Sequence, residues 1–516
     1  MPMLALAGLL TLNPGVQTPM AHGVVYEDRN QNGVRDFHER GIGGVLVSDQ
    51  MEIVRSDSQG RWSMPLRGDD ITFFVIKPSG WMTPVTEHQL PKFYYHHKPK
   101  GSPDENYRFK GVEPTGPLPK SIDFPLYRSR EGNAFTALFF GDPQPRDQRE
   151  VDYVRKDIVE PLVGKHNAVF GVTLGDIAFD NLDTFVPLNK SISMLGVPWY
   201  NVIGNHDMNY ESKDDKHSDE TYELIYGPNY YSWNWGKVHF VALDDVWWSR
   251  DAEDRGRYTG KLGEEQLAWV RKDLANVPMN NLVVISMHVP LVDVEDRQAL
   301  YELIKDRPFA MSVSAHTHTQ RHHFIGEEDG FHGKEPHHHV VNVTTSGSWW
   351  SGAPDEQGIP HTTMRDGAPN GYNLFHFDGN QYNIEFRAAR RHASYQMDII
   401  APDRLKEGQI RGTTVYANVF AGSDRSKVEI KFGNDGTWIP MTKTLERDPT
   451  YVETYERDKE LKTPWRTLSA PENSTHLWKS TIPVRVADAG VLVIHVRTTD
   501  MFGRTSYATK GIVIDR

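Results

Sequence analysis

The chain has 516 residues, so it is too long for one ordinary hydrophobic core, and we expect two to four domains. Its formal net charge of -12 comes from 57 basic and 69 acidic residues without a long basic run. This disfavours a non-specific nucleic-acid binder, because affinity for a phosphate backbone depends on clustered Lys and Arg. The absence of cysteine excludes disulfides and thiolate chemistry.

The N-terminus resembles a secretion signal. Leu4 to Leu12 is an apolar run that is too short to span a bilayer, and the bond between Ala21 and His22 is a candidate cleavage point. No Lys or Arg precedes the run, so the signal is incomplete. We expect residues 1–22 to be a signal peptide, the protein to be periplasmic or extracellular, and no segment to span a membrane. The alternative is an apolar N-terminus that is disordered or packed.

The segment that follows has the spacing of a calcium loop. Oxygen-bearing side chains occupy loop positions one, three, five, nine and twelve, and glycine occupies position six. A hard cation prefers oxygen ligands, and the glycine permits the sharp turn. The expected ligands of one Ca²⁺ are Asp28, Asn30, Asn32, Val34, Asp36 and Glu39. The alternative is an Asx-rich turn held by its own hydrogen bonds.

Short strand-like runs come next, at residues 44–48, 60–66 and 71–77, with turns between them. They resemble the small β-sandwich modules of bacterial surface proteins that carry such a loop before their first strands. We therefore predict an N-terminal β-sandwich over residues 23–128. Its later part, from Pro91 to Pro125, is rich in Pro, Gly, Lys and Tyr and is expected to be irregular.

From residue 133 to residue 394 strands and helices alternate, which predicts an α/β layered core. Each of two expected helices has apolar residues on one helical face. These residues are Val151, Val154, Ile158 and Leu162 in the first helix, and Leu267, Val270 and Leu274 in the second.

Five apolar runs of this region end in polar residues. They are Asp142 and Gln144 after 135–140, Asp176 after 169–174, Asn205-His206-Asp207 after 199–203, His288 after 282–287, and His316 and His318 after 310–314. Any one of these residues is more often a turn or a cap than a ligand. Together they suit two adjacent divalent cations, which need a bridging carboxylate and further nitrogen and oxygen ligands. Imidazole with carboxylate favours Mn, Fe or Zn over Ca.

The ordered motifs resemble those of the calcineurin-like metallophosphoesterase superfamily. They are Asp142-x-Gln144, Gly175-Asp176-x-x-x-Asp180, Gly204-Asn205-His206-Asp207, His288 and His316-x-His318. The resemblance implies an α/β/β/α sandwich core, in which Asp142, Gln144, Asp176 and His318 hold one metal and Asp176, Asn205, His288 and His316 hold the other. It also implies that His206 contacts the phosphate and assists the leaving group, with Asp207 orienting it.

The chain departs from the superfamily pattern at two positions. Gln144 stands where the family more often has His, and Ala315 stands where it has Gly. Glutamine offers a neutral carbonyl oxygen in place of imidazole, which is a weaker ligand for a borderline metal.

A second resemblance covers most of the chain. The motif Trp349-Trp350-Ser351-Gly352 and residues 355–372, together with β modules at both ends, resemble a bacterial subgroup whose core lies between an N-terminal and a C-terminal module. The tryptophan pairs at 247–248 and 349–350 are expected in the core, and the alternative is a wall for a sugar, base or choline group.

Two features of the last third complete the organisation. Histidines at positions 322, 323, 332 and 337–339 have no regular spacing, so we expect an exposed loop there rather than a metal site. Strand-like runs such as 414–420 and 490–498 predict a C-terminal β-sandwich over residues 395–516.

The predicted function is metal-dependent hydrolysis of a phosphomonoester or phosphodiester, carried by a small molecule or a surface glycan. In this prediction a hydroxide held by two metal ions attacks phosphorus in line. One alternative is a secreted surface-binding protein with structural metals, although a structural site has no need of a non-ligand histidine such as His206. Another is a nuclease of the same superfamily, although the chain lacks a basic stripe.

Overall fold

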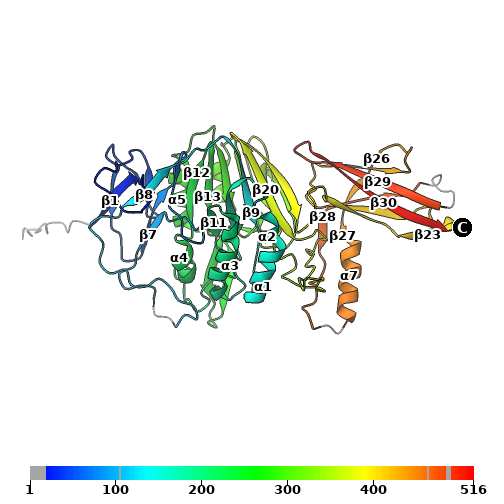
Figure 1. The fold of residues 1–516 in the computed structure, drawn as a ribbon, viewed down its shortest axis with the longest axis horizontal. Helices are drawn as coiled ribbons and strands as arrows, with labels where there is room; N and C mark the ends of the chain where they lie inside the picture. Colours follow the sequence, from blue (N-terminus) through cyan, green and yellow to red (C-terminus); the bar gives the residue numbers. More distant parts are fainter. Residues whose placement is uncertain (1–18, 104–105, 462–463, 484–489, 516) are drawn as a thin grey trace, which may run out of the picture.

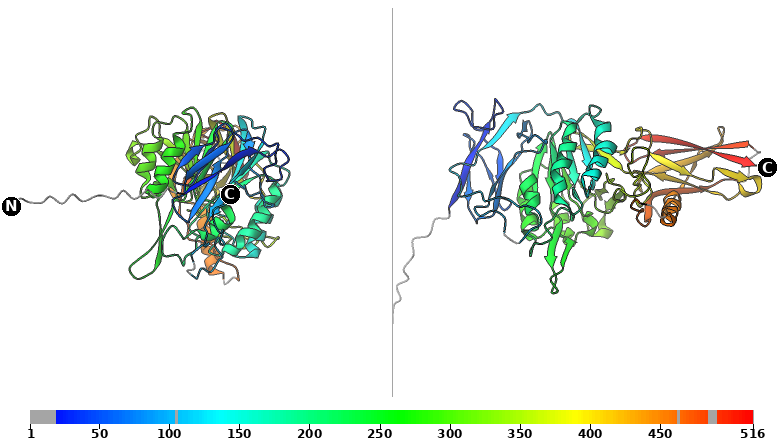
Figure 2. Two further views of the ribbon diagram at one scale, coloured as in Figure 1. Left: turned by 90° about the vertical axis from the view of Figure 1, so that its left-hand side faces the viewer. Right: turned by 60° about the horizontal axis from the view of Figure 1, so that its bottom comes forward.

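The computed structural model describes residues 19–103, 106–461, 464–483 and 490–515. The protein is elongated, with an N-terminal β module at one end, an α/β core in the middle and a C-terminal β module at the other end (Figures 1 and 2). The expected signal run, Leu4 to Leu12, lies outside the described residues.

The N-terminal β module is built from two four-stranded sheets. One has the order β4 (Arg61–Pro65), β1 (Met20–Glu27), β8 (Phe124–Arg128), β6 (Trp81–Met82), and the other has the order β3 (Ile53–Arg55), β2 (Leu46–Ser48), β5 (Ile71–Ile76), β7 (Tyr94–His97). Strand β4 shows the period of two that a half-buried strand requires, because Trp62 and Met64 are buried between exposed neighbours.

The start of this module corrects one sequence expectation. Strand β1 already begins at Met20, and Ala21 in it is fully buried and pairs with Met64. Cleavage between Ala21 and His22 would therefore cut through a strand and remove a buried side chain. The β module starts at Met20 rather than at residue 23.

The core contains two larger sheets, and it is the predicted α/β/β/α sandwich. The first has the order β11 (Trp199–Val202), β10 (Ala168–Leu174), β9 (Ala134–Phe140), β20 (Gly371–Asp378), β21 (Gln381–Ala388). The second has the order β12 (Tyr231–Trp235), β13 (Val238–Ala242), β16 (Leu282–Ser286), β17 (Ala310–Ser314), β19 (His337–Val341), β18 (Arg321–Ile325). A separate hairpin consists of β14 (Val246–Arg250) and β15 (Gly256–Gly260).

Strands β9, β10 and β11 are parallel, and so are β13, β16, β17 and β19. Because parallel neighbours end at the same edge of a sheet, the residues that follow these strands are brought together.

Both expected helices are confirmed. The helical segment Gln148 to Leu162 buries Val151, Val154 and Ile158, and the helix Glu264–Leu274 buries Leu267 and Val270. The helical elements of the core are α1 (Gln148–Val154), η1 (Arg155–Val159), α2 (Glu160–Leu162), η2 (Leu182–Thr184), α3 (Phe185–Ile192), η3 (Ser193–Leu195), α4 (Glu220–Tyr226), α5 (Glu264–Leu274), η4 (Leu291–Asp293), α6 (Arg297–Ile304) and η5 (Glu327–Asp329).

The expected exposed histidine loop holds for His332, which is exposed and outside any strand, but it is wrong for the other histidines. His337, His338 and His339 lie in β19 and are at most 5% exposed, and His322 lies in the neighbouring strand β18 and is 8% exposed. Histidine can enter a sheet interior when its ring nitrogens find partners there, and these rings bond to Ser, Tyr and one another.

The C-terminal β module also has two sheets. Their orders are β22 (Met397–Ile400), β24 (Thr414–Val419), β28 (Asn473–Thr481), β27 (Thr442–Arg447), and β23 (Arg404–Lys406), β30 (Thr505–Asp515), β29 (Gly490–Thr499), β25 (Lys427–Phe432), β26 (Ile439–Pro440). The module also contains η6 (Glu407–Gln409) and α7 (Pro449–Glu460), a helix that was not expected from the sequence. The sequence does contain a helix-start pattern there, because Asp448 caps this helix and Pro449 is its first residue.

The two β modules are attached differently. One continuous hydrophobic core runs from the N-terminal module into the α/β core, and at their junction Trp269 of α5 packs on Phe74 and donates to Ser48 Oγ at 2.9 Å. The C-terminal module has a core of its own.

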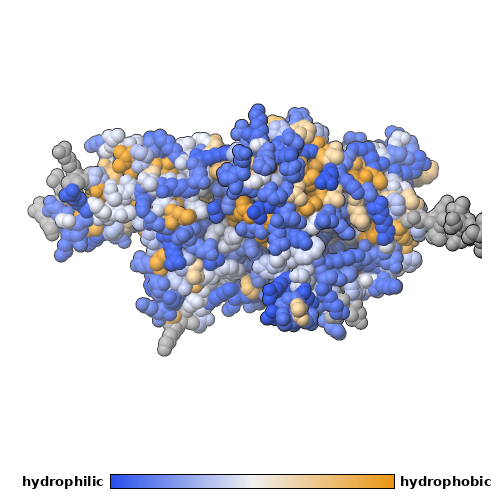
Figure 3. Space-filling model, turned by 180° about the vertical axis from the view of Figure 1, so that it is seen from behind, coloured by the Kyte–Doolittle hydropathy of each residue, from blue (hydrophilic) through white to orange (hydrophobic). Residues whose placement is uncertain are grey.

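Within the described residues, no helix is both long and apolar enough to cross a membrane. Apolar residues are scattered among hydrophilic ones on the face that Figure 3 shows.

Candidate metal centre

The polar residues after five core strands meet at one edge of the two sheets. Asp142 follows β9, Asp176 follows β10 and Asn205 follows β11, while His288 and His316 come from β16 and β17 of the other sheet. The site is thus built at the carboxyl ends of strands from both sheets, where α/β proteins usually place their chemistry.

The backbone of this edge is conformationally strained. Six non-glycine residues have a positive φ, a region that side chains rarely adopt and that costs roughly 1–3 kcal/mol per residue. They are Asp142 (40°), Gln144 (40°), Asp176 (48°), Asp180 (58°), His316 (71°) and His318 (55°). Strain of this kind persists only where the surrounding structure enforces it, so it marks this edge as functional.

Glycines let the loops approach closely. A Cβ at position 204 would lie 2.4 Å from Asp176 Oδ1, and a Cβ at position 175 would lie 2.4 Å from His288 Nδ1. The glycines before Asn205 and Asp176 therefore make room for the site itself.

His288 lies at the centre of one group of donors. Its Nδ1 donates to the carbonyl oxygen of Leu174 at 2.9 Å, so in the neutral ring Nε2 carries a lone pair. This Nε2 lies 3.2 Å from Asp176 Oδ1, 3.0 Å from Asn205 Oδ1 and 3.1 Å from His316 Nδ1. Such atoms repel one another unless a proton or a cation lies between them.

The pKa shifts of these histidines also favour a cation among the donors. Burial opposes charge on His288, yet Asp176 and Asp142 raise its pKa to about 10, so the carboxylates draw positive charge to this point. Burial lowers the pKa of His316 to about 4 and that of His318 to about 3. Neutral imidazole is the form that binds metals.

The second group of donors lies beside Asp176. Asp142 is fully buried and accepts the backbone N–H of His316 at 3.1 Å. His318 donates from Nδ1 to the carbonyl oxygen of Gly347, which fixes the ring and leaves Nε2 as the ligand atom.

Gln144 completes this group. Its Nε2 donates to Asp176 Oδ2, while its Oε1 is buried without a hydrogen-bond partner. A half-turn of the amide exchanges these two atoms and places the oxygen beside Asp176, as a ligand role requires. The donor set therefore fits divalent metal ions around Asp176, whose ligand atom lies with those of His288 and His316 in a group within 4.8 Å of one another.

The expected role of Asp207 is corrected by the structure. His206 Nδ1 bonds to Asp180 Oδ1 at 2.6 Å, and the ring stacks on Phe179 with 4.3 Å between ring centroids. The carboxylate of Asp207 is fully buried and accepts backbone N–H groups of Ile177, Ala178 and Gly204.

Asp207 thus fixes the strand-end loops, and Asp180 orients His206. The sequence motif already contained Asp180, but its pairing with His206 depends on how two loops meet.

Family comparisons agree with this geometry. Residues 135–320 match the calcineurin-like phosphoesterase family, residues 29–113 match the N-terminal module of calcineurin-like phosphoesterase, and residues 339–506 match its C-terminal module. The chain belongs to the calcineurin-like phosphoesterase family. The predicted subgroup, with modules at both ends of the core, is thereby confirmed.

Solved structures add only distant likenesses to this phosphoesterase. Purple acid phosphatase PPD1 from yellow lupin (Lupinus luteus) seeds is 13% identical, with a TM-score of 0.36, and the match covers 72% of this chain and 66% of that one. An endo-beta-1,4-mannanase from Thermotoga petrophila is 12% identical, with a TM-score of 0.15, over 72% of each chain. Both scores are too low to support an inference. Comparison with curated proteins gave no match.

The sheet edge that carries these donors, which we call the metal edge, opens into a small pocket of about 350 Å³. Its wall includes Trp349, which stacks on His318 with 3.8 Å between ring centroids, and Arg365, which pairs with Glu472 at 2.6 Å. Glu472 belongs to the C-terminal module, so that module closes one side of the pocket. For Trp349 this is the alternative that the sequence offered, a wall residue, whereas no sequence signal pointed to Glu472, which comes from a separate segment.

The tryptophan pairs divide between core and site. Trp350 is 2% exposed and Trp248 is 5% exposed, as the core expectation requires. Trp349 instead lines the metal pocket, and half-buried Trp247 lies 4.0 Å from the Lys261 ammonium.

The expected calcium loop is closed by its own hydrogen bonds. Both oxygens of Asp28 accept backbone N–H groups, from Asn32 at 3.2 Å and from Gly33 at 2.8 Å. Glu39 accepts from the N–H groups of Arg29 and Asp36. Such hydrogen bonds are those expected of an Asx-rich turn, the alternative to a calcium loop. Calcium binding stays a prediction.

Proposed function

We propose that this phosphoesterase hydrolyses small phosphoesters with two divalent transition-metal ions, Mn, Fe or Zn. The proposal depends above all on one observation: His288 Nε2 lies 3.0 Å from Asn205 Oδ1 and 3.2 Å from Asp176 Oδ1, so ligand atoms from three strand ends converge on one point. A cation fits at that point, and family membership supplies the reaction class.

Each metal would have its own ligands. Asp142, Gln144, Asp176 and His318 would hold one, and Asp176, Asn205, His288 and His316 would hold the other. When bound, the pair would supply Lewis acidity and neutralise the charge that develops on the phosphoryl oxygens.

His206 supplies the proton chemistry. It lines the pocket, and because Nδ1 is engaged by Asp180, Nε2 is the atom left to face a substrate. From there it donates a hydrogen bond to a phosphoryl oxygen and a proton to the leaving oxygen. Asp180 keeps the ring in that orientation.

The pocket favours a compact substrate. A volume of about 350 Å³ holds a phosphoryl group and a small substituent, and the C-terminal module limits its extent. The positive charge of Arg365 on the pocket wall is compensated by Glu472. We therefore favour a small-molecule phosphoester, or the phosphoryl end of a surface glycan.

The test is the Asp176→Asn variant, assayed with an aryl phosphomonoester and an aryl phosphodiester after loading with Mn²⁺ or Zn²⁺. Loss of a bridging ligand should lower activity by more than the ~10- to 100-fold typical of outer-shell changes. Asp183→Asn, an exposed carboxylate of the same core, is the matched control. Full activity of the Asp176→Asn variant with an unchanged fold would overturn the proposal.

We also propose that the protein is exported, on the strength of the apolar run Leu4 to Leu12. N-terminal sequencing of the mature protein should find a start at or before Met20, because removal of more residues would damage strand β1. Retention of the intact run in the mature protein would refute export by this route.

A further inference from the structure

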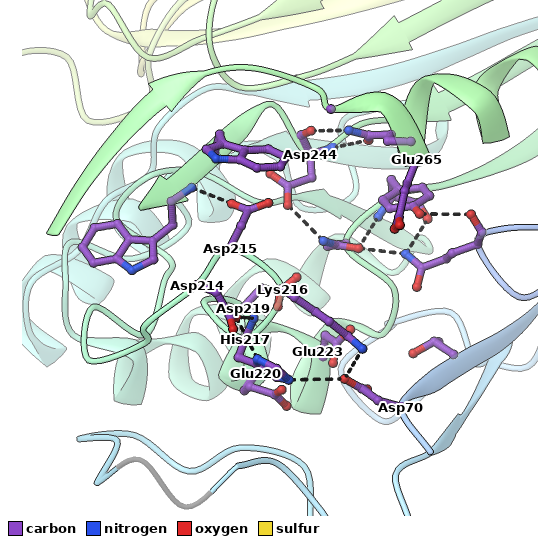
Figure 4. Close-up of a pocket in the computed structure, with 18 of the residues that line it drawn as sticks. Asp70, Asp214, Asp215, Lys216, His217, Asp219, Glu220, Glu223, Asp244 and Glu265 are labelled. Atoms are coloured by element: carbon purple, nitrogen blue, oxygen red, sulfur yellow. Dashed lines mark hydrogen bonds and ion pairs between the residues drawn. The ribbon is translucent and has the colours of Figure 1, made fainter. Parts of the chain in front are cut away.

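A second cluster of metal-ligand side chains, Asp70, His217 and Glu220, lies outside the phosphoesterase motifs. It lines a cavity of about 1680 Å³ between the N-terminal module and the core (Figure 4). Asp70 reaches it from the N-terminal module, and residues 214–223 and 244–250 reach it from the core. Carboxylates outnumber Lys and Arg along its walls, so the cavity attracts cations.

Three ligand groups converge in this cavity. Asp70, His217 and Glu220 each offer a ligand atom, and these atoms all lie within 4.8 Å of one another. His217 Nδ1 bonds to Asp214 Oδ1 at 2.8 Å, and its Nε2 lies 3.6 Å from Asp70 Oδ2. With the proton on Nδ1, the lone pair of Nε2 points to the carboxylate, which is the arrangement of a histidine that binds a metal.

The negative charge of the cluster is incompletely matched. Glu220 is fully buried and its Oε1 has no hydrogen-bond partner, and Asp219, which is 2% exposed, has an unpartnered Oδ1. Both residues line the cavity. Buried charge of this kind is unfavourable unless it is paired.

Two lysines compensate part of the charge and leave room for an ion. Lys98 Nζ lies 3.1 Å from Asp70 Oδ1 and 2.7 Å from Glu220 Oε2, so it uses only one oxygen of each carboxylate. Lys216 Nζ lies 3.1 Å from Asp70 Oδ2, but its side chain is 63% exposed and is free to move into solvent. Asp70 Oδ2 and Glu220 Oε1 then remain for a ligand.

We propose that Asp70, His217 and Glu220 bind a third divalent transition-metal ion, which joins the N-terminal module to the core. One imidazole with two carboxylates suits Mn²⁺ or Zn²⁺. Because the ligands come from two modules, the bound ion stabilises their junction. This site is independent of the proposed catalytic centre and of its activity.

The test measures bound metal by mass spectrometry of the full chain after loading with Mn²⁺ or Zn²⁺ and removal of free ion. His217→Ala and Asp70→Asn should each bind one equivalent less than the unmodified protein, and phosphoesterase activity should be unchanged. Asp69→Asn, an exposed neighbour on the same wall, should keep all the metal. Added Mn²⁺ or Zn²⁺ should raise the melting temperature of the Asp176→Asn variant, and this rise should disappear when Asp70→Asn is added.

The competing explanation is a network of ion pairs without metal. Unchanged metal content in both folded variants would establish it and overturn the proposal. Anomalous X-ray scattering from crystals of the unmodified protein grown with Mn²⁺ or Zn²⁺ gives the answer even if a variant fails to fold. A peak beside His217 supports the proposal, and its absence overturns it.

Discussion

Histidines gather at two places in the core of this phosphoesterase. At the metal edge are His288, His316 and His318. In the buried histidine group, which we define as His322 and His337–His339, the rings lie inside strands β18 and β19. Both groups are largely shielded from solvent, so burial does not tell them apart.

The hydrogen bonds of the ring nitrogens distinguish the two groups of histidines. At the metal edge, His288 and His318 donate from Nδ1 to backbone carbonyls, and the other nitrogen is left for a ligand role. In the buried group, His338 bonds to Tyr382 OH at 2.7 Å and to His322 at 2.9 Å. His339 bonds to Ser312 Oγ and accepts the N–H of Leu291. A histidine is thus a candidate ligand when one nitrogen is fixed and the other faces oxygen atoms.

The largest expected effect separates the two groups directly. His288→Ala removes a proposed metal ligand beside Asp176, so turnover of an aryl phosphate should fall by more than ~10²-fold, beyond the range for changes outside the ligand set. His339→Gln should change turnover by less than a few-fold at pH 7, because this ring faces serines rather than the metal edge. Similar losses in both variants, measured on folded protein, would erase the distinction.

A second prediction sharpens the metal edge by separating two aspartates. Asp180→Asn weakens the bond that orients His206, and kcat should fall by ~10- to 100-fold, less than the full ~10²–10⁴ of a general acid. Asp207→Asn instead leaves backbone N–H groups facing an amide, so the free energy of unfolding should fall by about 1–3 kcal/mol. Kinetics and chemical denaturation of both variants check this, and the reverse pattern would restore Asp207 as the orienting residue.

The third prediction uses acid to test the buried histidine group. Burial lowers the pKa of His337 to about 4 and holds the pKa values of His338 and His339 well below 6.5. Below pH 6.5 the unfolded chain therefore binds more protons than the folded protein, and stability falls as the pH drops toward 4. Each such ring contributes up to about 1.4 kcal/mol per pH unit.

Denaturation curves between pH 7 and pH 4 measure this slope. It should be shallower in His339→Gln. The control variant is His495→Gln, which changes a partly exposed histidine of the C-terminal module. An identical slope in all three proteins would mean that the buried rings already carry protons.

The smallest effect concerns the pocket over the metal edge. The guanidinium of Arg466 lies 5.9 Å from the Trp349 ring and 5.8 Å from the Phe179 ring, and these rings stack on His318 and His206. Arg466→Ala should raise KM for an anionic phosphoester about three- to tenfold, roughly 0.7–1.4 kcal/mol, with little change in kcat. The effect should shrink at high salt.

Exposed Arg411, which also belongs to the C-terminal module, is the matched control. An equal change in KM in Arg411→Ala would show that only the net charge matters.

The sequence by itself determined the metal edge, because apolar runs that end in Asp, Asn or His define strands and strand ends locally. The order of those ends, a layered α/β core and both expected helices followed from local patterns, whereas the α/β/β/α arrangement came from the family resemblance. The helix Pro449–Glu460 was also readable from its cap at Asp448.

Only the tertiary structure decided what each polar side chain contacts. His206 forms its hydrogen bond with Asp180 and not with Asp207. His339 of the buried histidine group bonds to a serine hydroxyl, and Glu472 lies in the pocket wall. The tertiary structure also placed Asp70 within ligand distance of His217. Periodicity shows which face of a strand is apolar, but hydrogen bonds between segments depend on how loops meet in space, and no local pattern encodes that.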